Sequence, residues 1–216
     1  MTLIAMITKM SEGLGRTCAI FFLTLLYSLP LGLLVALLRM CKVRFISAVT
    51  RGIISILRGT PLMLQLIAVA YGPFYLFGWT LLVKQKLLAI IIAFALNYAA
   101  YFAEIYRGGI ESIPVGQYEA AEVLGYTKTQ TFMKIILPQV IKIIMPSVTN
   151  EVITLVKDTS LAFTLAYAEV FSLAKQISAS QTSFMPFLIA GVFYFVANYI
   201  VERIMLKIEK SMDYYK

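Results

Sequence analysis

Residues 119–138 read EAAEVLGYTKTQTFMKIILP, and the first thirteen of them form a mostly polar stretch inside a chain of 216 residues that is 60% apolar. The mean hydropathy of +0.84 and several long uncharged stretches predict that most of the chain lies in a lipid bilayer. A polar segment between membrane spans is exposed to water, where it can contact another protein. We therefore interpret this segment as part of a docking hairpin for a cytoplasmic partner.

The charged residues make up 14% of the chain and cluster between its hydrophobic stretches. Helices satisfy their own backbone in lipid, and the sequence lacks the alternating strand pattern of an outer-membrane barrel. We therefore predict an all-α fold, with one polytopic helical membrane domain over residues 1–216. The net charge of +8 comes mostly from Lys and Arg that flank apolar spans, which indicates topology signals and no nucleic-acid partner.

Groups suited to catalysis or metal binding are scarce. The chain has no His, and its two cysteines, Cys18 and Cys41, fall in one predicted span and its exit, too far apart for a disulfide. Without His or a Cys pair at ligand spacing, the sequence predicts no metal site and no His-based nucleophile triad. We expect no catalytic residue and no enzymatic activity in this chain.

The hydrophobic stretches predict five membrane-spanning helices. Arg39 to Gly59 mix basic and apolar residues, which predicts an interfacial helix with its basic face in the lipid headgroups. Gly72 and Pro73 are expected to interrupt the second span, and the fourth is expected to break near Lys157, with a shorter helix following over residues 161–174. The spans are expected at about residues 17–38, 60–83, 87–107, 135–156 and 184–203, with the hairpin over about residues 110–131.

The distribution of Lys and Arg predicts the orientation in the membrane. The connector after the first span, the hairpin and the C-terminal tail together hold more of these residues than the opposite side. Basic residues are enriched on the cytoplasmic side of membrane proteins. We therefore expect a multi-pass protein of the cell membrane, with the N-terminus outside and the hairpin and C-terminus in the cytoplasm.

The hairpin carries its own start and stop signals. Ser112 is expected to cap a helix with Pro114 in its first turn, and Gly125 to end that helix in the left-handed conformation. Thr127 and Gln130 have the spacing of a capping box. The helix between these signals bears Glu119, where a carboxylate could attract Arg or Lys of a partner. The alternative is a solvated acidic helix.

The spacing Glu119-Ala120-Ala121-x3-Gly125-x9-Ile135-x-Leu137-Pro138 resembles the signature of permease subunits of ATP-binding-cassette (ABC) importers that work with an extracytoplasmic binding protein. Three further segments look like the polar amino-acid branch of that family, and the resemblance covers residues 13–209. It implies the type I importer permease fold with five transmembrane helices. The further segments are Arg58-Gly59-Thr60-Pro61-Leu62, the stretch from Ala103 to Ile110, and Asn150-Glu151-x5-Lys157-Asp158-Thr159-Ser160-Leu161.

The resemblance implies a division of labour among several proteins. Two permease chains, identical or homologous, would form the pathway, a cytoplasmic ABC ATPase dimer would dock on the hairpins, and a receptor would deliver a polar amino acid from outside. The chain lacks the Gly-x4-Gly-Lys-Ser/Thr loop that cradles phosphates, so ATP and Mg²⁺ would be bound by the ATPase, and no cofactor by this chain. The residues implied to couple to the ATPase are Glu119, Ala120, Ala121 and Gly125.

Polar residues inside the spans indicate the substrate pathway, because they are costly in lipid unless they face a cavity or a partner. Asn97, Tyr101 and Glu104 share one face of the third span. On the fourth span, Glu151 or Asp158 could receive the ammonium group of an amino acid, and amides or hydroxyls its carboxylate. The predicted pathway residues are Asn97, Tyr101, Asn150, Glu151, Thr154 and Asp158.

Structural roles compete with these assignments. Asp158 could cap the following helix, Glu104 is expected to pair with Arg107, and Asn97 and Tyr101 could join helices by hydrogen bonds. Gln65 could face the pathway or a neighbouring helix. A secondary carrier and a membrane scaffold are the competing functions, and basic, acidic, amide or sulfur-containing amino acids all stay open as cargo.

Overall fold

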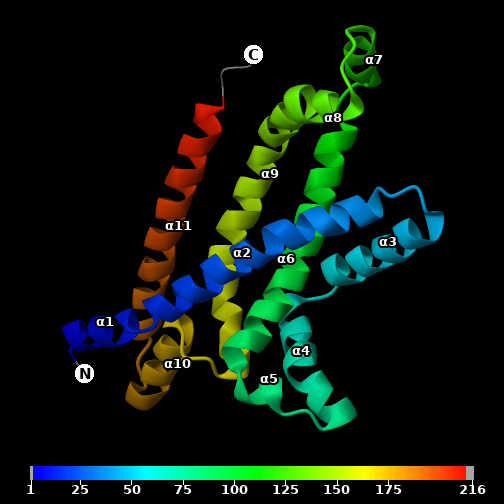
Figure 1. Cartoon of the computed structure of the whole chain (residues 1–216). Helices are drawn as coiled ribbons and strands as arrows, with labels where there is room; N and C mark the ends of the chain where they lie inside the picture. The colour runs from blue at the N-terminus through cyan, green and yellow to red at the C-terminus, as the bar shows by residue number, and fades with distance from the viewer. Residues whose placement is uncertain (1, 213–216) are drawn as a thin grey trace.

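The computed structural model describes residues 2–212, and these residues form an all-helical protein (Figure 1). Three long helices, α6 (Lys86–Glu111), α9 (Leu137–Asp158) and α11 (Met185–Ser211), run side by side, and α2 (Leu14–Arg39) crosses them obliquely. The remaining elements are α1 (Leu3–Ser11), α3 (Arg44–Gly59), α4 (Leu62–Phe77), α5 (Leu81–Lys84), α7 (Val115–Val123), α8 (Lys128–Thr131), the π-helical turn η1 (Phe132–Ile136), the 3₁₀ segment η2 (Thr159–Leu165) and α10 (Val170–Gln181).

Within the described residues, four helical stretches are long and apolar enough to cross a membrane. Helices α3 and α4 together pass the same test but bend by 109° at their junction, and they bring the number to five if they count as one span. The predicted all-α polytopic fold class is therefore confirmed. The four unbent stretches are Leu3–Arg39, Lys86–Glu111, Lys128–Leu165 and Met185–Ser211.

Small side chains explain how closely α2 and α6 pack. The buried face of α2 repeats every fourth residue and includes Thr24, Ser28, Gly32 and Ala36. A methyl group at Gly32 would lie 2.8 Å from Phe102 Cβ and 3.2 Å from the Ala99 carbonyl oxygen. Small residues at such positions let helix backbones approach closely in membranes, where packing drives association. This contact holds α2 across the middle of the bundle.

The α-helical part of the fourth span ends near Lys157, as expected, because α9 ends at Asp158. The chain then continues as the 3₁₀ segment η2, and Ala166 follows with φ of 50°. The tighter winding keeps the backbone hydrogen-bonded, because i to i+3 bonds replace the α-helical ones. The shorter helix that follows is α10, Val170–Gln181, and does not cover residues 161–174.

The expected break at Gly72 and Pro73 is wrong, because the helix is continuous there. Pro73 lies inside α4, which continues to Phe77 and ends where Gly78 adopts a left-handed conformation with φ of 70°. Glycine takes this conformation without the steric cost that other residues have. The helix therefore ends before residue 83, the expected end of this span.

A buried carboxylate fastens α10 at the end of the bundle opposite α7 (Figure 1). Glu169 caps α10 by accepting hydrogen bonds from the backbone N–H groups of Phe171 and Ser172, both at 2.6 Å, and it also accepts one from the Tyr194 hydroxyl at 2.8 Å. The Arg16 guanidinium donates to the Ala168 carbonyl oxygen at 2.9 Å. These bonds tie α10 to α11 and to the start of α2.

Candidate functional site

The hairpin between α6 and α9 follows the local signals in its sequence. Gly125 has φ of 79°, and the backbone N–H of Tyr126 donates to the Ala121 carbonyl oxygen at 3.0 Å, which is the Schellman pattern. Thr127 and Gln130 form the predicted capping box. The Thr127 backbone N–H donates to Gln130 Oε1 at 2.9 Å, and the Gln130 backbone N–H donates to Thr127 Oγ1 at 3.3 Å. The stop at Gly125 and the capping box are therefore confirmed.

The expected cap at Ser112 is wrong. Helix α6 extends to Glu111, so Ser112 is its C-cap, and the Ser112 hydroxyl donates to the Gly109 carbonyl oxygen at 2.8 Å. Pro114 occupies the N-cap position of α7, with no side-chain cap. Proline needs no partner for its missing N–H at a helix start, which explains why α7 begins without the serine.

The four predicted coupling residues do not point the same way. Glu119 and Ala120 are exposed, whereas Ala121 is buried against the rest of the hairpin, and Gly125 shapes the turn. The exposed surface of α7 and its end also includes Val123 and Leu124, which are 87% and 73% exposed. Sequence reasoning missed this apolar pair. The sequence did contain a signal for this exposed pair, since two large apolar residues stand side by side in a polar hairpin outside the spans.

Side chains at the base of the hairpin brace α7 against α9. The amides of Gln117 and Gln139 bond reciprocally, each donating to the other's oxygen, at 2.9 and 2.6 Å. Ile113, Ile136 and Val140 form a buried apolar cluster beside them. These contacts link α7 to the start of α9.

A polar pocket of about 220 Å³ lies near the middle of the bundle, where the start of α4 meets α6 and α9. Five of the six predicted pathway residues line it: Asn97, Tyr101, Glu151, Thr154 and Asp158. Asn150 does not line it and is exposed elsewhere on α9. The other lining residues are Thr60, Leu62 and Tyr98.

Asp158 does not cap the following helix, because its carboxylate accepts a hydrogen bond from the Tyr98 hydroxyl at 2.8 Å. Sequence reasoning missed Tyr98, which is 2% exposed and lies in an apolar stretch of α6. Its signal was a hydroxyl adjacent to Asn97 within a membrane span. A buried tyrosine hydroxyl usually requires a partner.

Asn97 joins helices in addition to lining the pocket. Its amide nitrogen donates to the Leu57 carbonyl oxygen at 3.0 Å and to Gln65 Oε1 at 3.1 Å. Gln65 in turn donates to the carbonyl oxygens of Leu57, at 2.7 Å, and Thr60, at 3.1 Å. Gln65 therefore faces the neighbouring elements, and its bonds hold the α3–α4 bend against α6.

The charged groups around the pocket are unevenly paired. Glu104 accepts two hydrogen bonds from Arg107, at 2.6 and 3.0 Å, which confirms the expected ion pair. Glu151 is half-buried, and its carboxylate forms no ion pair or hydrogen bond with any residue in 2–212. Arg58 lies 5.1 Å from the centre of the Tyr101 ring. Glu151 is thus available to a cationic group in the pocket.

Comparison with known proteins identifies the family. The family model described as binding-protein-dependent transport system inner membrane component matches residues 28–214. The nopaline transport system permease protein NocM of Agrobacterium fabrum is 35% identical over 209 residues, covering 93% of this chain and 86% of the relative. The L-cystine transport system permease protein TcyB of Bacillus subtilis is 35% identical over 208 residues, covering 95% and 87%.

A solved structure described as an amino acid ABC transporter with histidines matches with a TM-score of 0.87 and 30% identity, covering 98% of this chain and 99% of that chain. The MetNI methionine ABC transporter matches with a TM-score of 0.76 at 19% identity, which supports the fold alone. Since the family model and the relatives span most of the sequence, this chain belongs to the binding-protein-dependent transport system inner membrane components, as a multi-pass permease subunit.

Proposed function

We propose that this chain imports a polar amino acid, received from an extracytoplasmic binding protein and driven by ATP that a separate ATPase dimer binds with Mg²⁺ and hydrolyses. Membership of the family makes the chain a non-catalytic membrane subunit and implies a binding protein as partner. The observation that carries the amino-acid cargo is the pocket of about 220 Å³ lined by the carboxylates of Glu151 and Asp158. Relatives named for cystine and arginine transport support the same cargo class.

The pocket offers chemistry for both charged ends of an amino acid. Glu151 has no partner of its own among residues 2–212, so a substrate ammonium group could bind it without breaking an existing bond. Asp158 is held by Tyr98, which fixes its orientation. Thr154 lines the same pocket, and its hydroxyl can donate to a carboxylate, whereas the Thr60 hydroxyl already donates to the Ile56 carbonyl oxygen at 2.8 Å. The predicted pathway assignment is kept for every residue except Asn150.

The hairpin is proposed as the docking site of the ATPase. Glu119 and Ala120 would contact the ATPase directly, together with Val123 and Leu124, because these side chains are exposed. Ala121 and Gly125 would act by shaping α7, since one is buried and the other ends the helix. Closure of the ATPases on ATP would then move α9 through the braced base of the hairpin.

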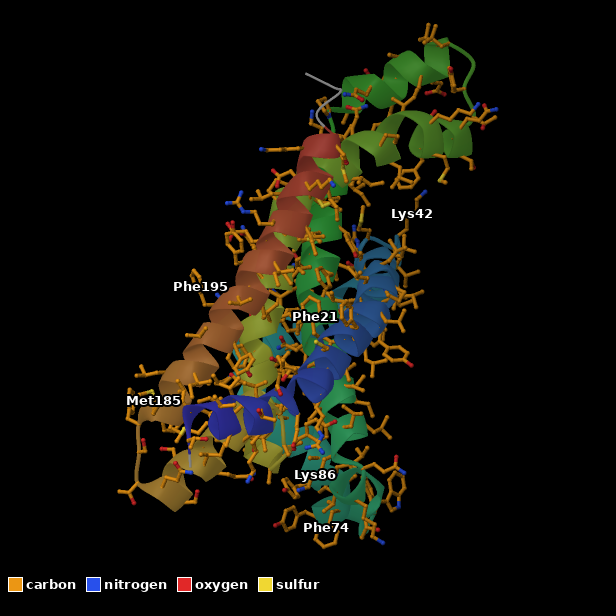
Figure 2. All side chains as sticks on the ribbon, turned by 90° about the vertical axis from the view of Figure 1, so that its left-hand side faces the viewer. Phe21, Lys42, Phe74, Lys86, Met185 and Phe195 are labelled. Carbon is orange, nitrogen blue, oxygen red and sulfur yellow. The ribbon has the colours of Figure 1, made fainter. Side chains whose placement is uncertain are left out.

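The orientation that we propose places the N-terminus outside, with the hairpin and the C-terminus in the cytoplasm. The end of α11 and the hairpin lie at one end of the bundle, while α1 and α10 lie at the other (Figure 1). Residues 1–216 would form one permease domain, paired with a second permease chain, identical or homologous. The outward-pointing Phe195 on α11 (Figure 2) fits a surface that meets lipid.

Reconstitution tests the proposal. The chain would be copurified with its ATPase and receptor, and uptake of labelled basic, acidic, amide and sulfur-containing amino acids measured in proteoliposomes. We expect uptake that requires ATP and the receptor, and a loss of about tenfold or more in Glu151→Gln, since a charge-assisted bond is removed. Glu202→Gln, exposed on α11, is the matched control. Uptake that follows a proton or sodium gradient without ATP would instead identify a secondary carrier.

A further inference from the structure

Three arginines form a line along α3. Arg44, Arg51 and Arg58 are spaced by seven residues, which places them on nearly one face of the helix, about 10 Å apart. Phe45, Ile53 and Ile56 occupy other positions of the helix and are exposed apolar residues. We call the three arginines the arginine stripe.

The arginine stripe lines two adjoining hollows. One hollow, of about 380 Å³, is lined by Arg51, Arg58, Ser55 and, from other helices, Arg39 and Glu104. The second, of about 390 Å³, is lined by Arg44, Arg51, Lys42 and Ser47, among others. Arg51 borders both hollows, and Arg58 also packs on Tyr101, a lining residue of the polar pocket. The arginine stripe thus lines both hollows and contacts one residue of the polar pocket.

Arg51 and Arg58 form no close ion pair within residues 2–212, and Arg58 lies within electrostatic range of Glu104 and Glu151. Glu104 is the one carboxylate that lines either hollow, and it is hydrogen-bonded to Arg107 and lies 3.8 Å from Arg39 Nε. An anionic group entering the hollows would therefore meet arginines that lack a close carboxylate partner.

The depth of Arg58 argues against lipid headgroups as its counter-charge. The end of α3 bonds to Asn97, roughly midway along α6, so Arg58 lies near the centre of that span. The hydrocarbon core extends only about 15 Å to either side of the centre. A charged side chain at such depth is costly unless it faces a water-filled cavity or a partner charge. A hydrated pathway satisfies this requirement, whereas headgroups lie farther out.

The direction of the stripe is that of α3. Lys42, next to the start of α3, lies nearer the hairpin end than Phe74 and Lys86, which lie toward the opposite end (Figure 2). Helix α3 runs mostly across the bundle, with its start somewhat nearer than its end to the hairpin end that we place in the cytoplasm (Figure 1).

We propose that the arginine stripe is an exit path that binds the carboxylate of the amino acid after it leaves the polar pocket, passing it from Arg58 to Arg51 to Arg44. This assignment rests on the proposed function and names the groups that bind the substrate after it leaves the polar pocket. The pocket carboxylates hold the ammonium end, and the stripe holds the acid end. Successive arginines offer equivalent bidentate partners for one carboxylate, so it can pass from one to the next without a large barrier.

Thiol labelling of the complete transporter in vesicles tests the environment of the stripe without requiring transport. In a background with Cys18→Ser and Cys41→Ser, Ser55→Cys places a thiol in the first hollow and leaves every arginine intact. We expect an anionic methanethiosulfonate (sulfonatoethyl) to react at least about tenfold faster than a cationic one (trimethylammonium-ethyl), because a cleft of one charge concentrates counter-ions. Ile56→Cys, on the exposed apolar side, is the matched control and should react slowly with both.

The vesicle composition separates the substrate path from a headgroup site. The labelling rate at Ser55→Cys should be the same in phosphatidylcholine vesicles and in vesicles that also contain phosphatidylglycerol. A rate that falls with phosphatidylglycerol would show that headgroups occupy the stripe, and no reaction with either reagent would show that it faces dry lipid or another chain. Either result overturns the proposal.

Uptake measurements then test the role of the charge. Arg51→Gln should lower the maximal uptake rate about tenfold while ATP hydrolysis stimulated by the receptor persists, and Arg51→Lys should recover most of the uptake rate. Arg203→Gln, which removes an exposed arginine of α11, is the control for net charge. Normal uptake by Arg51→Gln would overturn the exit path. Wild-type complex that shows no ATP-driven uptake would count against the proposed function, and the labelling result would still stand.

Discussion

The hairpin and the polar pocket are built in opposite ways. The hairpin is held by bonds between near neighbours, such as the capping box of Thr127 and Gln130. The pocket is held by bonds between distant residues: Asn97 and Leu57 are 40 residues apart, and Tyr98 and Asp158 are 60 apart. Of the predicted coupling residues, Glu119 and Ala120 are exposed on the hairpin, whereas the pocket residues Asn97, Tyr98 and Asp158 form hydrogen bonds within the chain. A docking element can therefore be read from adjacent residues, but a binding pocket depends on which helices meet.

The largest effect is expected where the hairpin meets its partner. Glu119→Lys reverses an exposed charge on α7, and like charges brought together at an interface cost several kcal/mol. We expect ATP-dependent uptake to fall by about 100-fold or more, since about 2.7 kcal/mol corresponds to that factor. The measurement is uptake in proteoliposomes with equal amounts of folded permease. Glu202→Lys, exposed on α11, is the control, and unchanged uptake and ATP hydrolysis in Glu119→Lys would remove the coupling assignment.

The contact that joins the hairpin base to the bundle gives the next largest effect, this time on stability. Gly109 is buried, and a methyl group there would overlap the Ile144 Cγ2 atom and lie 3.3 Å from Val140 Cγ1. Both neighbours are β-branched and cannot turn away freely. We expect Gly109→Ala to lower the free energy of unfolding by about 1–3 kcal/mol, seen as a lower Tm in detergent.

Gly108→Ala is the matched control, because a methyl group at Gly108 meets no atom within 4 Å. Alanine is the better helix former, so this variant should be neutral or more stable by up to about 1 kcal/mol. Equal Tm values for the two variants would show that α6 and α9 are not in tight contact at the hairpin base.

A smaller effect is expected in the pocket. Tyr98→Phe removes the hydroxyl that donates to Asp158 at 2.8 Å and leaves a partly buried carboxylate without that partner. We expect a loss of about 1–2 kcal/mol in unfolding free energy and a weaker apparent affinity for substrate. Tyr101→Phe serves as control, because no hydrogen bond of its hydroxyl is found within residues 2–212. If the two variants change the unfolding free energy and the apparent substrate affinity equally, the hydrogen bond to Asp158 adds nothing beyond the presence of a hydroxyl at that position.

The same contrast explains which predictions from sequence succeeded. The helical fold, the stop at Gly125 and the capping box depend on composition and adjacent residues, and they are confirmed. Ser112 was misassigned because its role depends on how far α6 extends before it. The end of the α-helix near Lys157 was expected, but the 3₁₀ winding that follows was not, because no residue type specifies it.

The pocket shows the limit of helical spacing as a guide. Asn150, Thr154 and Asp158 follow each other at four-residue steps, but the pocket side of α9 is Glu151, Thr154 and Asp158. Each residue advances about 100° around a helix, so Asn150 points well away from Glu151. Tyr98 was missed for a related reason, since only its contact with Asp158 on another helix reveals its polar role.

The smallest predicted effect tests whether the two regions are connected mechanically. The reciprocal bonds of Gln117 and Gln139 link α7 to α9, and a double-mutant cycle of Gln117→Ala and Gln139→Ala should give a coupling energy of about 0.5–1 kcal/mol in unfolding free energy. If this link also carries motion, each single variant should hydrolyse more ATP per amino acid imported than the wild type. Additive stabilities with an unchanged ratio would mean that the apolar cluster of Ile113, Ile136 and Val140 alone transmits the displacement. Since Ile113 directly precedes α7 and Val140 lies on α9, truncation of this cluster would then be the variant that uncouples ATP hydrolysis from transport.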